Sequence, residues 1–381
     1  MLKGTYPLER FGALRTPFYY YDTQLLQRTL ETVREALRSH PSWQMHYAVK
    51  ANSHPEILRR IAGAGFGADC VSGGEIQAVL DAGFAPSGIV YAGVGKADWE
   101  IRLALEQGIC RFNVESAAEL EVIASIASEM GKVAPVSLRV NPDIGAHTHA
   151  GITTGLAENK FGIYHGVLEP VIRRALELPS VSFRGLHFHI GSQILDMSDF
   201  TALCNRVNDI TARLERLRLP VGDLNVGGGL GIEYAHPNHL PMADFNGYFN
   251  TFKRHLQGNR PVHFELGRSI VAPCGTLISR VLYVKEGLSR RFAILDAGMN
   301  DLIRPALYHA MHRIENLSSD RPEQAYDVVG PICESSDVFG KGVALNECRR
   351  GDFIAIRSAG AYGESMASCY NSRPLPGSFF D

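Results

Sequence analysis

The sequence predicts an α/β protein, in which a (β/α)8 TIM barrel is joined to a discontinuous antiparallel β domain that forms a sandwich or a barrel. From residue 45 onward, short apolar runs are each followed by a Gly-rich or polar turn and then by a segment with helical spacing of its apolar residues. Eight such runs are present, and eight parallel strands close a barrel. Beyond Glu265, apolar or alternating runs of strand length replace this pattern and predict the second domain.

The predicted barrel strands are rich in β-branched and aromatic residues. They cover residues 45–50, 67–71, 89–93, 111–115, 136–140, 186–190, 223–227 and 262–266. Residues 22–40 and 116–132 each open with a residue that can cap a helix and then carry apolar residues at helical spacing. Pro55 suits the first turn of a further helix. The elements therefore alternate as a barrel requires.

Two segments define the expected domain organisation. The strand-like aromatic run at residues 16–22 would be unstable alone, so we expect it to pair with the later sheet. We therefore expect residues 24–266 to form the barrel domain, and residues 1–23 with 267–381 to form the β domain. Residues 141–163, rich in Gly, Asn and Thr, are too long for a simple connector and predict a loop at the mouth of an active site.

Composition excludes several classes of protein. Of the 381 residues, 45% are hydrophobic and 20% are charged, which is typical of a folded globular chain. The 38 Lys and Arg nearly balance the 40 Asp and Glu, without a block of like charge, so we expect no nucleic-acid partner. The 7 Cys are scattered and never form a CxxC pair, which indicates reduced thiols. No run approaches the ~18 apolar residues of a membrane span, and we expect a cytoplasmic protein with no membrane partner.

Polar residues gather at the C-terminal ends of the predicted strands, which is the face where barrel enzymes build their active sites. These residues are Lys50, Asp69, Arg139, His189, the run Gly227 to Gly229, and Glu265. Their coincidence on one rim predicts a catalytic site there.

Each of these residues also has an ordinary structural interpretation. Lys50 is either a surface lysine with a buried stem, or a desolvated lysine that forms a Schiff base with a carbonyl cofactor. The NVGGGLG run at 225–231 is either a turn, or an anion cradle of backbone N–H groups without the spacing of a nucleotide-binding loop. Glu265 is either the partner of a pyridinium nitrogen or one half of a rim salt bridge with Arg268.

Four histidines raise the question of a metal. His187 and His189 lie on one face of a predicted strand, and His147 and His149 lie in the insertion. No carboxylate or Cys accompanies either pair at a familiar ligand spacing, so we expect no metal. A stacking or proton-handling histidine is the favoured interpretation.

Two loops near the C-terminus carry reactive side chains. Cys333 lies beside an acid in a Gly- and Pro-flanked loop, which indicates an exposed thiol. Tyr362 lies between small residues in SAGAYG, so that its hydroxyl is either close to a ligand or that of an ordinary loop tyrosine.

Taken together, these segments resemble the diaminopimelate decarboxylases, which are fold-type III pyridoxal-phosphate decarboxylases related to alanine racemase. The resemblance extends from about Thr16 to Pro374. It is carried by YAVKAN, GADCVSGGE, LRVNP, TTGLAENKFGI, GLHFHIGSQI, NVGGGLG, ELGRS, CESSD and SAGAYG. The chain departs from the usual pattern at Leu266 and at Ala150 and Gly151, which affects loop details and no proposed catalytic group.

The resemblance implies a set of cofactor contacts. Lys50 would bind pyridoxal phosphate covalently, His189 would stack on its ring, and Glu265 would pair with the pyridine nitrogen. The other residues expected to hold or border the cofactor are Asp69, Arg139, Ser192, Gly228, Gly229, Gly267, Arg268 and Tyr362.

The resemblance also implies a substrate site shared between two chains. Substrate contacts would come from Arg268, Arg304, Tyr308, Glu334 and Tyr362. Cys333 and Glu334 would come from the partner chain of a homodimer, and Cys333 would be catalytic together with Lys50 and His189. The implied reaction is decarboxylation of meso-2,6-diaminopimelate to L-lysine and carbon dioxide, the last step of lysine biosynthesis.

Three alternatives stay open at this point. The same scaffold could act on ornithine, arginine or carboxynorspermidine, although Arg304, Tyr308 and Glu334 suit a second amino-acid head group better than an amine tail. A racemase is disfavoured because no second-half tyrosine base is found. A non-catalytic binding protein would usually have lost Lys50 or Cys333, and both are present.

Overall fold

The computed structural model describes residues 4–144 and 160–381, which form two compact units. The barrel unit comprises Leu30–Gly231 and Asp244–Gly267, and the β unit comprises Met1–Thr29, Ile232–Ala243 and Arg268–Asp381. This division assigns Ile232–Ala243 to the β unit, whereas the sequence placed that segment inside the barrel domain. The segment Ile232–Ala243 follows the glycine run after the seventh barrel strand, and the chain re-enters the barrel unit at Asp244.

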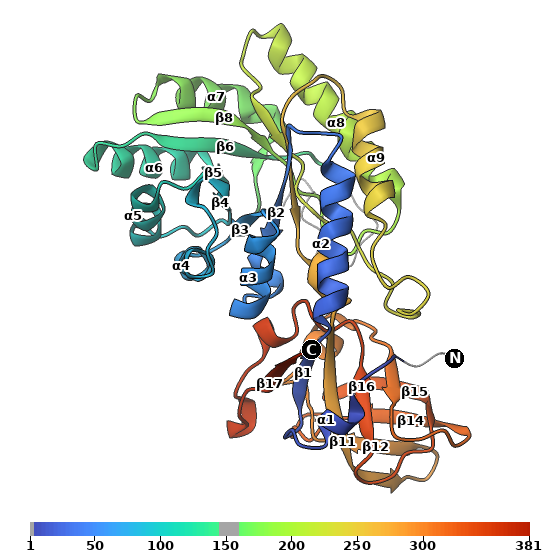
Figure 1. The fold of residues 1–381 in the computed structure, drawn as a ribbon. Coiled ribbons are helices and arrows are strands. Elements are labelled where there is room, and N and C mark those ends of the chain that lie inside the picture. Colours follow the sequence, from blue (N-terminus) through green and yellow to red (C-terminus); the bar gives the residue numbers. More distant parts are fainter. Residues whose placement is uncertain (1–3, 145–159) are drawn as a thin grey trace. The chain divides into compact units, whose positions relative to one another are not determined.

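The barrel unit is a closed, all-parallel barrel, as predicted (Figure 1). Its strands are β2 (Trp43–Ala48), β3 (Gly67–Cys70), β4 (Ile89–Tyr91), β5 (Arg111–Val114), β6 (Ala134–Asn141), β8 (Val181–His187), β9 (Asp223–Asn225) and β10 (Val262–Leu266). They pair in the order β5-β4-β3-β2-β10-β9-β8-β6, and the β5–β6 pairing closes the ring. A short strand, β7 (Ile163–Tyr164), pairs beside β6.

Several predicted strands extend a few residues beyond the observed ends, and two of these shifts move a candidate catalytic residue out of the sheet. The strand β2 ends at Ala48, and Lys50 lies in the following 3-10 turn, Val49–Ala51. The strand β8 ends at His187, so His189 follows it. Both segments continue as apolar runs beyond the last ladder pairing, so their sequence pattern does not mark the point where the backbone turns.

Helices connect the strands and lie on the outside of the barrel (Figure 1). They are α2 (Thr23–Leu37), α3 (Pro55–Gly63), α4 (Gly73–Asp81), α5 (Asp98–Gln107), α6 (Ala117–Glu129), α7 (Leu168–Glu177), α8 (Met197–Arg216) and α9 (Phe245–His255). Pro55 begins α3, as predicted, because a first-turn residue needs no backbone N–H donor. The Ser116 hydroxyl accepts the Glu119 N–H at 3.1 Å and caps the predicted α6.

The β unit is a mostly antiparallel sheet. Its strands are β1 (Phe18–Tyr21), β11 (Gly275–Glu286), β12 (Arg291–Leu295), β13 (Ile314–Asn316), β14 (Glu323–Val329), β15 (Val338–Asn346), β16 (Phe353–Ile356) and β17 (Gly377–Phe380). The aromatic strand β1 pairs antiparallel with β11, which confirms the expected return of the N-terminal run to the later sheet. Two pairings, β12–β14 and β1–β17, are parallel.

An aromatic core holds the N-terminal segment on this sheet. Phe11, from the short helix α1 (Leu8–Phe11), packs against Phe18, Tyr20, Ile278 and Phe353, all of them buried. The ring centroids of Phe11 and Phe18 lie 5.2 Å apart in an edge-on arrangement, which is favourable for aromatic pairs. Two further short helices of this unit, α10 (Arg268–Val271) and α11 (Arg304–Tyr308), carry candidate substrate residues.

Candidate active site

The first pair of candidate residues lies at the end of β2 and in β3. Lys50 Nζ lies 3.1 Å from Asp69 Oδ2, and the lysine side chain is 41% exposed whereas that of the aspartate is 1% exposed. Burial and the charge of Glu265 raise the pKa of Asp69 to about 6, although Lys50 acts in the opposite direction. Its second oxygen, Oδ1, has no hydrogen-bond partner among the described residues. The pair joins an accessible amine to a buried carboxylate that is only partly satisfied.

Glu265, in β10, is the most strongly held carboxylate of the barrel interior. Its Oε1 accepts the amide groups of Asn113 at 3.0 Å and Asn225 at 2.6 Å, and its Oε2 accepts His187 Nε2–H at 3.0 Å. Burial would raise its pKa, but His187, followed by Lys50, outweighs burial and lowers the pKa below its usual range. Glu265 is therefore a buried, ionised carboxylate that accepts three hydrogen bonds.

His189 lies just beyond β8, beside the glycine run that follows β9. Burial, with the charges of Arg139 and Lys50, lowers the pKa of His189 to about 3, so the ring is neutral at pH 7. The Gly228 N–H donates to His189 Nδ1 at 3.3 Å and fixes the ring orientation. A neutral, oriented imidazole presents a flat face that can stack on an aromatic ring.

The glycine run tolerates no side chain. Gly227 and Gly229 have positive φ values of 70° and 99°. A Cβ on Gly228 would lie 1.9 Å from the Glu265 carbonyl oxygen, and one on Gly229 would lie 2.7 Å from the Gly191 carbonyl oxygen. The backbone therefore approaches its neighbours too closely for a side chain at these positions.

Three further predicted residues have structural partners in the barrel unit. Arg139 NH1 donates to Glu115 Oε1 at 2.6 Å in a buried ion pair, and its guanidinium lies 4.6 Å from the centre of the Phe161 ring. Ser192 follows β8 in the same loop as His189. A Cβ on Gly267 would lie 3.0 Å from the methyl groups of Ala48 and Ala51, so this glycine allows close packing at the end of β10.

In the β unit, two buried arginines converge on one tyrosine hydroxyl. The oxygen of Tyr234 accepts Arg268 NH1–H at 2.8 Å and Arg304 NH1–H at 3.1 Å. The Arg268 guanidinium also lies 4.9 Å from the centre of the Tyr362 ring. Burial lowers the pKa of Arg304, and no carboxylate pairs with it among the described residues. This cluster is a cationic site suited to a carboxylate.

The orientation of Arg304 is set by a neutral histidine. His312 Nδ1 lies 2.8 Å from the Arg357 carbonyl oxygen, so Nδ1 carries the hydrogen and Nε2 accepts Arg304 NH1–H at 2.9 Å. Burial and the charge of Arg304 lower the pKa of His312 to about 3. Tyr308 lies at the end of α11, one turn beyond Arg304.

Cys333 and Glu334 lie in the loop before β15, and both are exposed. The Cys333 N–H donates to Asn371 Oδ1 at 3.3 Å, and the Tyr370 hydroxyl donates to Glu334 Oε1 at 2.6 Å. Both residues belong to the predicted site, together with Arg268 and Arg304.

Four residues of these clusters were not predicted from the sequence. They are Asn113, Asn225, Tyr234 and His312. The available signal was a polar side chain at an inward position of an apolar strand, as in RFNVE, but a single strand cannot show which groups meet across a barrel. The predicted histidines His147 and His149 lie outside the described residues.

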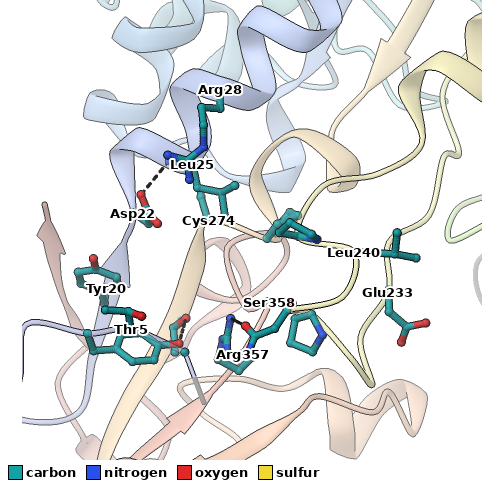
Figure 2. A pocket seen from close by; sticks show the side chains of 17 residues that line it. Thr5, Tyr20, Asp22, Leu25, Arg28, Glu233, Leu240, Cys274, Arg357 and Ser358 are labelled. Carbon is teal, nitrogen blue, oxygen red and sulfur yellow. Dashed lines mark hydrogen bonds between the residues drawn. The ribbon is translucent and has the colours of Figure 1, made fainter. Parts of the chain in front are cut away.

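A separate hollow in the β unit contains none of the predicted site residues. Its volume is about 410 Å³, and Figure 2 shows Asp22, Arg28, Glu233 and Arg357 around it. These charges have internal roles: Asp22 Oδ1 accepts the Leu25 N–H at 2.8 Å, and Arg357 NH1 donates to Glu315 at 3.1 Å. The hollow is therefore not the candidate active site.

Residues 4–144 and 160–381 contain neither a group of metal-binding side chains nor a membrane-spanning helix. No three His, Cys, Asp or Glu side chains there are grouped so that they could hold a metal ion. No helix in those ranges combines the length and the apolar character needed to cross a membrane.

Comparison with known proteins identifies the family. Residues 24–272 match the pyridoxal binding domain of the pyridoxal-dependent decarboxylases. A diaminopimelate decarboxylase of Bacteroides thetaiotaomicron is 60% identical over 377 residues, which cover 98% of each chain. The chain belongs to the diaminopimelate decarboxylase family. The resemblance inferred from the motifs is thus confirmed, and members of this family are carboxy-lyases that depend on pyridoxal phosphate.

Solved structures of the family have the same fold. The Helicobacter pylori diaminopimelate decarboxylase complexed with L-lysine superposes with a TM-score of 0.92 at 42% identity and covers 98% of this chain and 93% of its own. The M. jannaschii enzyme, also in complex with L-lysine, has a TM-score of 0.91 at 35% identity and covers 98% of this chain and 89% of its own.

The barrel unit fits the cofactor of this family. An accessible amine at Lys50, a neutral flat ring at His189 and an ionised acceptor at Glu265 surround a glycine run that no side chain can enter. The unpartnered Asp69 Oδ1 is a further buried acceptor beside the amine. These groups match the carbonyl, the ring, the ring nitrogen and the phosphate of pyridoxal phosphate.

Proposed function

We propose that this chain decarboxylates meso-2,6-diaminopimelate to L-lysine and carbon dioxide with the residue roles given below. The observation that carries the proposal is the pairing of chemistries in one chain, namely a barrel site suited to pyridoxal phosphate and a buried two-arginine cluster suited to a carboxylate. The reaction is the last step of lysine biosynthesis, and the curated relatives named diaminopimelate decarboxylase support it.

The barrel residues hold and polarise the cofactor. Lys50 Nζ would hold the cofactor covalently through its carbonyl carbon, while Asp69 would keep the lysine in place. His189 supports the ring face, and Glu265 accepts a hydrogen bond from the ring nitrogen. The bound cofactor supplies an electron sink for the bond that breaks. The phosphate contacts are assigned to Ser192, Gly228, Gly229, Gly267, Arg268 and Tyr362, with Arg139 beside them.

The residues of the β unit select the substrate. Arg268 and Arg304 bind the substrate carboxylate that is not lost as carbon dioxide, and Tyr308 and Tyr362 lie beside that carboxylate. An amine tail, as in ornithine, would leave the buried guanidinium group of Arg304 without an anion, which is costly. The cluster therefore favours a substrate with a second amino-acid head group over ornithine, arginine or carboxynorspermidine.

The working unit is a homodimer that shares its active sites. Cys333 and Glu334 are assigned to the site of the partner chain, where the thiol returns a proton to the carbon that has lost its carboxyl group and Glu334 binds the distal amine. Support comes from the exposure of both residues and from exposed apolar side chains of the same unit. These are Leu307, Met311, Tyr370 and Leu375. We place the enzyme in the cytoplasm, which cell fractionation with an antibody would test.

Release of carbon dioxide tests the reaction. Purified, cofactor-loaded protein is given meso-diaminopimelate, with L-ornithine, L-arginine and L-lysine as parallel substrates. We expect release from diaminopimelate alone. Release only from another amino acid would overturn the assigned roles of Arg304, Tyr308 and Glu334, and cofactor binding without any release would favour the binding-protein alternative.

A further inference from the structure

The interior of the barrel contains a polar layer at the level of Glu265. The residues that surround its carboxylate come from three other strands: Asn113 from β5, His187 from β8 and Asn225 from β9. All three are almost completely buried. Barrel interiors are usually filled by branched apolar side chains, so this layer has a desolvation cost that requires an explanation.

The side chain of His187 makes a single hydrogen bond among the described residues. Its Nε2–H donates to Glu265 Oε2 at 3.0 Å, and its Nδ1 is buried without a partner. The side-chain oxygen of Asn113, Oδ1, likewise has no partner among the described residues, so that side chain also acts only through the amide N–H that it donates to Glu265. Two buried side chains each leave one polar atom unsatisfied in order to reach the same carboxylate.

The number of donors leaves one place on the carboxylate. An ionised carboxylate offers about four acceptor positions, and the three donors occupy three of them. Donors to the charged form also stabilise it over the protonated form. The remaining position of Glu265 is available to one further donor, which in the proposed function is the ring nitrogen of the cofactor.

We propose that His187 is a positioning residue, which together with Asn113 and Asn225 keeps Glu265 ionised and oriented so that the shared proton resides on the cofactor ring nitrogen. The inference rests on the proposed role of Glu265 and deepens it. Each donor removed makes Glu265 a stronger base and shifts the proton from the ring nitrogen toward the carboxylate. The protonation state of the ring nitrogen therefore depends on the hydrogen bond that His187 donates to Glu265.

Nitrogen-15 NMR measures that state without relying on activity. The enzyme is loaded with pyridoxal phosphate labelled at the ring nitrogen, and the signal is followed from pH 6 to 9. We expect the wild-type nitrogen to stay protonated at pH 7. In His187→Leu the midpoint rises by about one pH unit, or about tenfold in the proton equilibrium, because Glu265 without this hydrogen bond is a stronger base and the pair holds its shared proton more tightly. The signal at low pH also lies nearer to that of the unprotonated ring nitrogen, because the proton shifts toward the carboxylate. His187→Gln retains an N–H donor and restores the wild-type titration.

A second variant and a matched control complete the design. Asn113→Leu is nearly isosteric and removes one donor to Glu265, while no other side-chain hydrogen bond of Asn113 is lost. It should shift the midpoint in the same direction. This variant provides the test if His187→Leu does not fold. The control is His46→Gln: His46 is buried and bonds to the Gly88 carbonyl oxygen and to His263, at 3.0 and 2.9 Å, and has no bond to Glu265. Its titration should match that of the wild type.

The outcomes separate the inference from the proposed function. Wild-type titration in both His187→Leu and Asn113→Leu would overturn the inference. So would an unprotonated ring nitrogen at pH 7 in wild-type enzyme that still decarboxylates diaminopimelate. A protonated nitrogen that responds to His187 as expected, in an enzyme that releases no carbon dioxide from diaminopimelate, would support the positioning role and overturn the assigned reaction alone.

Discussion

Lys50 and Asp69 form an ion pair of 3.1 Å in which the amine is 41% exposed and the carboxylate is 1% exposed. The two side chains come from consecutive barrel strands, or from the turn that follows, so the pairing depends on the register of β2 and β3. A buried acid holds the amine of the lysine, while a large part of the lysine side chain stays exposed. This asymmetry distinguishes Lys50 from an ordinary surface lysine.

The first prediction concerns Lys50 itself. Lys50→Ala removes the amine that binds the cofactor, so we expect no covalent cofactor after borohydride reduction, as measured by mass spectrometry, and a loss of turnover of at least about a thousandfold. Lys132→Ala is the control, because Lys132 Nζ caps the end of a helix by donating to the Leu105 carbonyl oxygen at 2.7 Å. Wild-type turnover in Lys50→Ala would sink the assignment.

The second prediction is a pH dependence of stability. The folded-state pKa of Asp69, about 6, lies above its ordinary value of 3.8, so the folded protein binds the proton more tightly. This group therefore favours folding below about pH 4, and its contribution is lost as the pH rises through about 6. The effect is on the order of 3 kcal/mol.

Asp69→Asn removes that titration. From pH 4 to pH 7, the melting temperature of the variant should rise by a few degrees relative to that of the wild type. Differential scanning calorimetry of cofactor-free protein measures both curves. Two parallel curves would show that Asp69 has its ordinary pKa in the folded chain.

The third prediction concerns Tyr234, which holds the two arginines. Tyr234→Phe keeps the ring but removes the hydroxyl that accepts both guanidinium groups. We expect KM for diaminopimelate to rise about tenfold with kcat changed less than about threefold, because hydrogen bonds to charged groups contribute to holding the retained carboxylate.

Calorimetric titration with L-lysine and with cadaverine, which lacks the carboxylate, extends this test. The variant should lose affinity for L-lysine and not for cadaverine. Tyr326→Phe is the matched control, since this buried tyrosine of the same unit accepts the Cys348 N–H at 3.1 Å, away from the arginines. An equal rise of KM in both tyrosine variants would point to a general loss of stability.

The fourth prediction tests whether two chains share each site. Lys50→Ala and Cys333→Ala are each expected to be nearly inactive as pure proteins, although Cys333→Ala still binds the cofactor. When the two are unfolded together and refolded at equal amounts, half of the dimers are mixed and each mixed dimer has one intact site. Activity should return to about a quarter of the wild-type value. No recovery on mixing, with dimers confirmed by sedimentation, would mean that Cys333 does not act across the interface.

Local sequence patterns were sufficient for much of the architecture. The barrel follows from apolar runs of strand length alternating with helical spacing, and residues such as Pro55 and Ser116 mark helix starts through their own backbone chemistry. The same patterns placed Lys50, Asp69 and Glu265 at one rim, because parallel strands present their C-terminal ends together. These features depend on residues that are neighbours in the chain.

The remaining features depend on residues that are distant in the chain. Glu265 meets Asn113 across 152 residues, and Arg268 meets Tyr234 across 34. Closure of the barrel and the path of Ile232–Ala243 through the β unit decide these encounters. The hydrophobic pattern of a single strand does not predict such a long-range contact. A polar residue within an apolar strand gives the same pattern whether or not its side chain has a partner in the fold. The sequence thus specified the barrel and the lysine that follows its first strand, while long-range packing specified the hydrogen bonds to Glu265 and the convergence of the arginines.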